Sequence, residues 1–353
     1  MSIAELARPE IRALRPYEAA VQVDDTIRLN ANEAPRTGAT DRFRRPLNRY
    51  PEIRPRRLRS ALAARYGCRP EELLVTRGSS EAIDLLMRAF CRAGHDSVVT
   101  TAPTFSMYRH YAAVQGAALR EVATARETGF ALDVGLLLAA CDDSTRLIFV
   151  CSPNNPTGNL VPAATLTELL EKRGDRSAIV VDEAYIEFAD APSAVELLPQ
   201  YPNLLVLRTL SKALAFAGAR CGAVIGRAEV VALLDTIQAP YALATPVVEC
   251  VENALDGDYH AATGGWLREI VTERQRVAAE LERFRSVKRV WPSAANFLLV
   301  EVADAPELMR RCSDDKVLLR YFGAELSDCV RITIGSPAEN RRMLDCFSAL
   351  EAS

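Results

Sequence analysis

The 353-residue sequence lacks the patterns of several common functional classes. Its three histidines have no metal-ligand spacing and its nine cysteines form no Cys-x-x-Cys pair, so we predict no metal site and the reduced thiols of a cytosolic protein. The net charge of −3 argues against a general nucleic-acid binder. The longest uncharged run, residues 147–167, contains three prolines and cannot span a membrane. Neither a P-loop nor a Gly-x-Gly-x-x-Gly motif is present.

Apolar residues make up 49% of the chain, which is enough for a large buried core. Between residues 73 and 225, apolar runs alternate with helical segments, and this predicts a mostly parallel sheet with helices on both faces. A long amphipathic stretch then leads to two alternating strands near the C-terminus. We therefore expect an α/β fold with an N-terminal arm (1–65), a large domain (66–255) and a small α+β domain (256–353).

One lysine follows the apolar run at residues 204–207, which continues through Thr209 to Ser211 and Lys212. Open α/β sheets bind ligands at the carboxyl ends of their strands, where a partly buried lysine can lose its proton and form a Schiff base with an aldehyde. Arg220, eight residues later, offers a fixed charge for phosphate. Because a Ser-Lys pair alone is usually an ordinary surface feature, this prediction depends on the other motifs.

Four further motifs lie where predicted strands end: Arg77-Gly-Ser-Ser-Glu81, Tyr108, Asn154-Asn-Pro-Thr-Gly158 and Val181-Asp-Glu-Ala-Tyr185. The first leads into a helix, and a serine N-cap with free backbone N–H groups makes a phosphate site. Taken singly, these motifs are also explained by helix capping, core packing, a rigid turn and a salt bridge.

In order and spacing, these motifs resemble the fold type I pyridoxal-phosphate aminotransferases, and among them the branch that acts on L-histidinol phosphate. The resemblance runs from about Pro16 to the C-terminus. It implies that Lys212 binds the aldehyde of the cofactor and then moves a proton as general base and acid. It further implies that Asp182 meets the pyridine nitrogen and that Tyr108 stacks on the ring.

The same resemblance assigns the remaining contacts of pyridoxal 5′-phosphate. Asn155 and Tyr185 would hold the 3′-oxygen of the cofactor. The phosphate contacts that it implies are Ser79, Ser80, Ser211, Arg220 and Tyr50.

Tyr50 matches a family motif whose tyrosine reaches the cofactor phosphate of the neighbouring subunit, which implies a homodimer with shared active sites. It stands among eight arginines between residues 42 and 59. These arginines are explained as a solvated face or as an electropositive mouth that steers a phosphorylated substrate.

For the substrates, the resemblance implies that Arg331 holds an α-carboxylate and that Arg320 and Tyr17 meet the phosphate end. The family loop over the substrate usually reads Asn-Glu-Asn-Pro, but here Ala34 follows Glu33, so we assign no role to the loop at residues 30–33.

The implied reaction is a ping-pong amino transfer in histidine biosynthesis. L-Glutamate donates its amino group and 2-oxoglutarate leaves, and imidazole-acetol phosphate then exchanges with L-histidinol phosphate. Three alternatives stay open: a threonine-phosphate decarboxylase, an aminotransferase with broad or aromatic specificity, and a non-catalytic module that senses pyridoxal phosphate.

Overall fold

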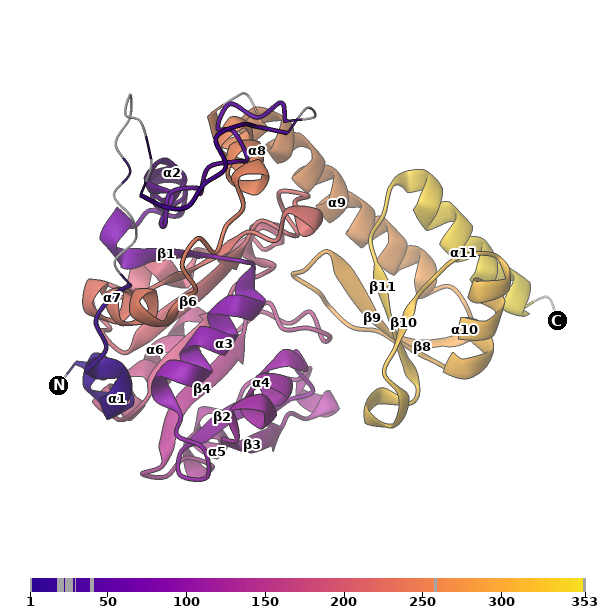
Figure 1. The fold of residues 1–353 in the computed structure, drawn as a ribbon. Coiled ribbons are helices and arrows are strands. Elements are labelled where there is room, and N and C mark those ends of the chain that lie inside the picture. Colours follow the sequence, from indigo (N-terminus) through magenta and orange to yellow (C-terminus); the bar gives the residue numbers. More distant parts are fainter. Residues whose placement is uncertain are drawn as a thin grey trace.

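The computed structural model describes residues 2–17, 22, 28, 30–38, 41–256 and 259–351, so Leu29, which immediately precedes the loop at residues 30–33, lies outside them. Figure 1 shows two bodies, each built on its own sheet, with the long helix α9 (Tyr259–Leu281) running between them. The predicted α/β fold, with a large mostly parallel sheet and a smaller α+β part toward the C-terminus, is confirmed. Every helix in the described chain is too short or too polar to cross a lipid bilayer.

The large sheet has seven strands in the order β1-β7-β6-β5-β4-β2-β3. Its strands are β1 (Leu73–Thr76), β2 (Ser97–Ala102), β3 (Ala118–Ala123), β4 (Thr145–Cys151), β5 (Ala178–Asp182), β6 (Leu204–Thr209) and β7 (Gly222–Ile225). β7 runs antiparallel to both of its neighbours, whereas β2 to β6 pair in parallel. The carboxyl ends of β4, β5 and β6 therefore meet at one edge.

Helices cover both faces of this sheet because its central strands are apolar on both sides. Val180 faces one core and Val181 the other, since successive strand residues point to opposite faces. One core includes α3 (Ser79–Phe90), α4 (Met107–Gln115) and α7 (Ala228–Ile237). The other includes α2 (Arg56–Tyr66), α5 (Val134–Ala139), α6 (Ala163–Arg173) and α8 (Thr245–Asp256).

The small sheet is antiparallel throughout, in the order β10-β11-β9-β8. Its strands are β8 (Val287–Val290), β9 (Phe297–Val302), β10 (Arg320–Tyr321) and β11 (Cys329–Thr333). Its apolar face packs against α9, α10 (Ala305–Asp314) and α11 (Pro337–Glu351). A short helix, α1 (Pro9–Arg12), lies against α7 in the N-terminal segment.

The start of α3 differs from the prediction of a serine N-cap. Gly78 occupies the N-cap position with φ +75°, and Ser79 and Ser80 form the first turn. A left-handed φ favours glycine because a Cβ would clash with the backbone there. The first N–H groups of this helix still lack intrahelical partners, so the helix end keeps its capacity for an anion.

Two glycines let β7 approach the start of α3. A Cβ on Gly222 would lie 2.7 Å from the carbonyl oxygen of Arg208 and 3.0 Å from the Cα of Gly78. Both neighbours are backbone atoms and cannot rotate away. We therefore expect Gly222→Ala to lower the free energy of unfolding by about 1–3 kcal/mol.

Urea titration of the purified protein measures this loss. Gly218→Ala is the matched control, because a Cβ there would meet no atom within 4 Å. Equal unfolding free energies for the two variants would contradict the close approach.

Candidate active site

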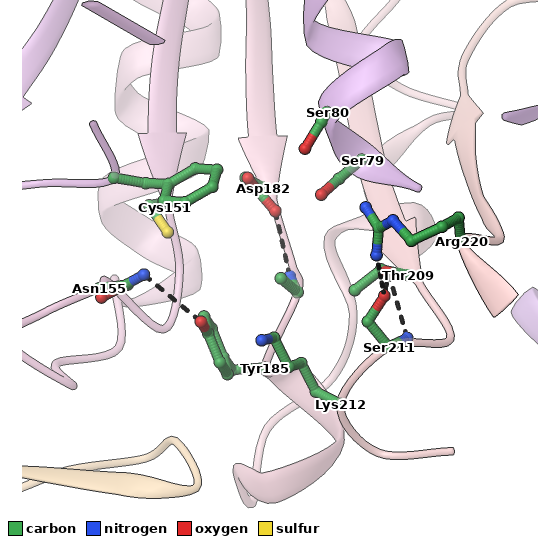
Figure 2. A pocket seen from close by; sticks show the side chains of 12 residues that line it. Ser79, Ser80, Cys151, Asn155, Asp182, Tyr185, Thr209, Ser211, Lys212 and Arg220 are labelled. Carbon is green, nitrogen blue, oxygen red and sulfur yellow. Dashed lines mark hydrogen bonds between the residues drawn. The ribbon is translucent and has the colours of Figure 1, made fainter. Parts of the chain in front are cut away.

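The carboxyl ends of β4, β5 and β6 open onto one cavity (Figure 2). Eight of the predicted site residues line it together: Ser79, Ser80, Asn155, Asp182, Tyr185, Ser211, Lys212 and Arg220. A second, outer cavity shares Asn155, Tyr185 and Lys212 with it and is also lined by Arg320 and Arg331. The outer cavity therefore joins residues of the large sheet to residues of the small one.

Lys212 follows the end of β6 and points its Nζ into the cavity, toward the side on which Tyr185 lies (Figure 2). Nζ is 5.8 Å from the centre of the Tyr185 ring. Burial lowers the pKa of Lys212, and the positive charges of Arg331 and Arg220 lower it further. Lys212 therefore loses its proton more readily than an exposed lysine does. The neutral amine is the form that acts as a nucleophile and a base.

On the other side of the cavity, cationic and hydroxyl groups gather where α3 begins. Arg220 donates from Nη1 to Ser211 Oγ at 3.2 Å, and Thr209 Oγ1 donates to the same oxygen at 2.9 Å. A Cβ on Gly78 would lie 2.6 Å from Nη2 of Arg220, so the glycine makes room for the guanidinium. Among the described residues Arg220 forms no ion pair, and with the end of α3 it suits a phosphate.

Asp182 ends β5 at the back of the cavity and is only 2% exposed. Its Oδ1 accepts a hydrogen bond from the Ala184 N–H at 3.2 Å, and its Oδ2 accepts one from the Tyr108 hydroxyl at 2.8 Å. Within the described chain no cation pairs with it, and burial raises its pKa to about 6 despite these two bonds. Such a carboxylate favours a ligand that brings a positive charge or a donor.

The position of Tyr108 corrects its predicted role. Its side chain is fully buried in α4, stacked on Phe149 with ring centres 4.7 Å apart, and it does not line either cavity. Phe105, three residues earlier, lines both cavities in its place. Tyr108 therefore lies behind Asp182, where it cannot stack on a ring in the cavity.

A chain of hydrogen bonds links the small sheet to the large one. Arg331 on β11 donates from Nη1 to Asn155 Oδ1, and Asn155 Nδ2 donates to the Tyr185 hydroxyl at 3.4 Å. The Nε of Arg331 is buried and has no partner in the described chain. This unsatisfied donor at the cavity wall is available to an anionic ligand.

Arg320 on β10 and Arg331 on β11 occupy directly opposite positions in this antiparallel strand pair. Like charges in this arrangement repel, and the charge of Arg320 contributes to lowering the pKa of Arg331, after burial as the main cause. Neither guanidinium forms an ion pair with a carboxylate among the described residues, and both line the outer cavity. The pair therefore favours a ligand with negative charge.

Tyr17 and Tyr50 do not line the two cavities. Tyr50 stacks on Tyr241 with ring centres 4.7 Å apart. Tyr17 and Tyr50 are each about half exposed. Glu33 holds this segment by accepting hydrogen bonds from the Tyr50 N–H and from Arg49, each at 2.8 Å. A role for Tyr50 at the site of a neighbouring subunit stays a prediction.

Several lining residues were not predicted from the sequence: Phe105, Cys151 and Thr209 in the inner cavity, and Phe322 and Glu325 in the outer one. Phe105 belongs to the same motif as Tyr108, so its aromatic character was a usable signal. Nothing in the local sequence around Phe322 marks it as a cavity residue.

The burial of Asp182 predicts an unusual effect on stability. Because its folded-state pKa is raised to about 6, the protonated form stabilises the fold, and this contribution is lost as the pH rises through 6. We expect Asp182→Asn to raise the free energy of unfolding of the ligand-free protein by up to about 3 kcal/mol above pH 7. The gain should disappear toward pH 4.

Asp96 is the matched control, since it is equally buried but accepts hydrogen bonds from Arg92 and pairs with Arg146. Burial would raise its pKa, but these contacts outweigh burial and lower it. Asp96→Asn should therefore destabilise the protein by about 1–3 kcal/mol above pH 5. Urea titrations from pH 4 to pH 8 measure both effects, and a loss of the same sign for both variants would contradict the prediction.

Comparison with known proteins places this arrangement in a family. The model for aminotransferase class I and II matches residues 25–347. A histidinol-phosphate aminotransferase from Xanthomonas campestris pv. campestris (strain B100) is 43% identical over 349 residues, which cover 97% of this chain and 96% of the relative. One from Xylella fastidiosa (strain 9a5c) is 41% identical over 357 residues, covering 99% and 98%.

A solved structure gives the same result. The histidinol-phosphate aminotransferase from Sinorhizobium meliloti, in complex with pyridoxal-5′-phosphate, matches with a TM-score of 0.77 and 26% identity, covering 86% of this chain and 84% of that one. The resemblance predicted from the motifs is thus confirmed, and the chain belongs to the aminotransferase class I and II family.

Proposed function

We propose that this chain transfers an amino group between L-histidinol phosphate and 2-oxoglutarate, with pyridoxal 5′-phosphate as its cofactor. The observation that carries the substrate assignment is the pair of arginines at the outer cavity, Arg320 and Arg331. The two amino-group donors, glutamate and histidinol phosphate, must bind in the same pocket. Glutamate brings two carboxylates, and histidinol phosphate brings a phosphate. The names of the full-length relatives support the same reaction.

The inner cavity fits the proposed cofactor on three counts. Lys212 presents to an aldehyde an amine whose pKa is lowered by burial. The hydroxyl groups and guanidinium near the start of α3 suit its phosphate. Asp182 offers a buried carboxylate to its ring nitrogen. When bound, the cofactor supplies an aldehyde that joins amines and a protonated ring that withdraws electrons from the substrate Cα.

The residues of the inner cavity then have separate tasks. Lys212 takes the proton from Cα and returns it, because its Nζ lies inside the cavity with a lowered pKa. Asn155 and Tyr185 orient the 3′-oxygen of the cofactor from one side. Phe105, in place of Tyr108, covers a face of the ring. The phosphate contacts are Ser79, Ser80, Ser211 and Arg220.

The outer cavity binds the variable ends of the two substrates. Arg331 holds the α-carboxylate of glutamate with its guanidinium group, whose Nε has no partner in the described chain. The Cζ of this guanidinium lies 5.2 Å from the centre of the Phe297 ring. Arg320 is exposed at the rim and meets the phosphate of histidinol phosphate. Histidinol phosphate lacks the α-carboxylate, so the two arginines serve the two substrates unequally.

The active unit of this proposal is a homodimer. Tyr50 and Tyr17 are both about half exposed. We assign both to the site of the second subunit, Tyr50 at the cofactor phosphate and Tyr17 at the substrate. The division into an arm (1–65), a large domain (66–255) and a small domain (256–353) belongs to the same proposal. The cytosolic location stays a prediction.

Single-turnover reactions test the proposed function. Purified protein loaded with pyridoxal 5′-phosphate is mixed separately with L-histidinol phosphate, L-glutamate, aromatic amino acids and threonine phosphate, and the visible absorbance is followed. Histidinol phosphate and glutamate should react fastest, and Lys212→Ala should lose the reaction almost completely. Release of CO₂ from threonine phosphate without need of 2-oxoglutarate would favour the decarboxylase, and no reaction with any amine would favour a sensor module.

The two arginines should divide the half-reactions between them. We expect Arg320→Ala to impair the histidinol-phosphate half-reaction more than the glutamate one, and Arg331→Ala to show the opposite bias. Each lost contact is worth on the order of 2–5 kcal/mol for the substrate that depends on it. Single-turnover rates and half-saturation concentrations measure the bias.

Arg289→Ala is the control for these variants. Arg289 lies on β8 of the same sheet, with its guanidinium over Trp291, and it does not line the outer cavity. It should leave both half-reactions within about twofold. Equal losses in both half-reactions for both cavity arginines would remove the division of labour.

Activity shared between subunits predicts complementation. Mixing inactive Lys212→Ala subunits with strongly impaired Tyr50→Ala subunits creates hybrid dimers in which one site has both residues intact. Part of the activity should return, up to about a quarter of the wild-type value for random pairing. If differently tagged subunits are shown to exchange and no activity returns, Tyr50 does not act across the interface.

A further inference from the structure

Tyr108 is a buried tyrosine whose hydroxyl has a specific task. Its ring is already packed on both sides, stacked on Phe149 and edge-on to Phe105 at 5.7 Å between centres. A phenylalanine would fill this space equally well. The hydroxyl reaches Asp182 Oδ2 at 2.8 Å, and burying it is favourable only because that acceptor is there.

The surroundings of Asp182 make this bond important. The other titratable groups that face it are Cys151 at the end of β4 and Tyr185 after β5, and burial raises the pKa of both. Both are therefore neutral at working pH. Lys212 and Arg220 enter the same cavity from the β6–β7 connection, but neither forms an ion pair with Asp182 in the described chain. Among the residues that the structure describes, only the Tyr108 hydroxyl and the Ala184 N–H favour the charged carboxylate.

Tyr108 is suited to donate a hydrogen bond to a charged carboxylate. Burial raises its pKa well above the usual value, and the neighbouring negative charge of Asp182 raises it further. The hydroxyl therefore keeps its proton across the whole range in which the enzyme works. Because an ionised carboxylate can only accept, the bond to Oδ2 runs from the tyrosine to the carboxylate whenever Asp182 is charged.

We propose that Tyr108 is a positioning residue that holds the Asp182 carboxylate ionised and in one orientation toward the cofactor ring, an inference that rests on the proposed function. The carboxylate then meets a ring nitrogen with its charge in place, without first losing a proton. Tyr108 does not touch the cavity, so it acts through Asp182. Its ring also supports Phe105, which lines the cavity, so one side chain secures two contacts of the bound ring.

The test compares how tightly the full-length protein holds pyridoxal 5′-phosphate between pH 5 and pH 9. Dissociation constants are measured by absorbance after equilibrium dialysis of the loaded enzyme. In the unaltered protein, affinity should weaken as the pH falls and Asp182 takes up a proton. In Tyr108→Phe the midpoint of this loss should move up by about one pH unit, so that affinity falls about tenfold at pH 5 but only about twofold at pH 7.

Two controls separate this role from general destabilisation. Tyr66→Phe removes another buried hydroxyl of the large domain, one that has no hydrogen-bond partner in the described chain, and should leave the midpoint unchanged. In an Asp182→Asn background, Tyr108→Phe should change affinity at pH 5 less than twofold. A midpoint is independent of the fraction of protein that is folded, so partial misfolding does not obscure the result.

Several outcomes would overturn the proposal. The first is a midpoint that stays unchanged in Tyr108→Phe, and the second is a midpoint that moves equally far in Tyr66→Phe. The third is a loss of affinity from Tyr108→Phe that is as large in the Asp182→Asn background as in the unaltered protein. Its failure is distinguishable from that of the proposed function. Lack of reaction with histidinol phosphate, while binding keeps its Tyr108-dependent midpoint, would reject the substrate and leave the role of Tyr108 standing.

Discussion

A carboxylate buried without a cation is the constraint around which this active site is built. Asp182 ends the central strand of the seven-stranded sheet, where two neutral donors hold it and burial raises its pKa. Removing such a group from water is costly unless a positive partner arrives. The neighbouring strands β4 and β6 bring Asn155 and Lys212 to the same edge, so the partner that satisfies Asp182 also lies within their reach.

The remaining charges of the site have the opposite sign. Lys212, Arg220, Arg320 and Arg331 surround the two cavities, and within the described chain none of them forms an ion pair with a carboxylate. Elsewhere arginines are commonly paired, as Arg208 is with Glu183 and Glu187 just behind this edge. The concentration of unpaired positive charge attracts anions, and together with burial, the larger cause, it lowers the pKa of Lys212. One electrostatic arrangement thus serves both binding and proton transfer.

The position of Arg331 depends on contacts between the two bodies of the chain. Arg126 forms two hydrogen bonds to the carboxylate of Asp328, at 2.7 and 2.8 Å, and Asp328 immediately precedes β11. The Ala294 N–H donates to the Gly158 carbonyl at 2.8 Å. Together with the bond from Arg331 to Asn155, these contacts fix the strand that carries Arg331 against the turn after β4. The substrate site is therefore a property of both sheets.

Much of the fold could be predicted from the sequence because buried parallel strands need continuous apolar runs. Such runs are visible before Asn154, Asp182 and Ser211, and the polar residues that follow each run must emerge at the same edge of the sheet. Most residues of the inner cavity could therefore be predicted from the sequence. The family resemblance, carried by the spacing of the same residues, is confirmed by the comparisons.

Other features of the site were decided only by the tertiary structure. Phe105 and Tyr108 are three residues apart in one motif, and only the turn before α4 determines that the first lines the cavity and the second supports Asp182. The pairing of Arg320 with Arg331 depends on strand register, which links residues that are not neighbours in sequence. The sequence by itself determined which residue types end each strand, since burial dictates hydrophobicity locally. Which side chains meet was decided by packing, because contacts between distant segments exist only once the chain has folded.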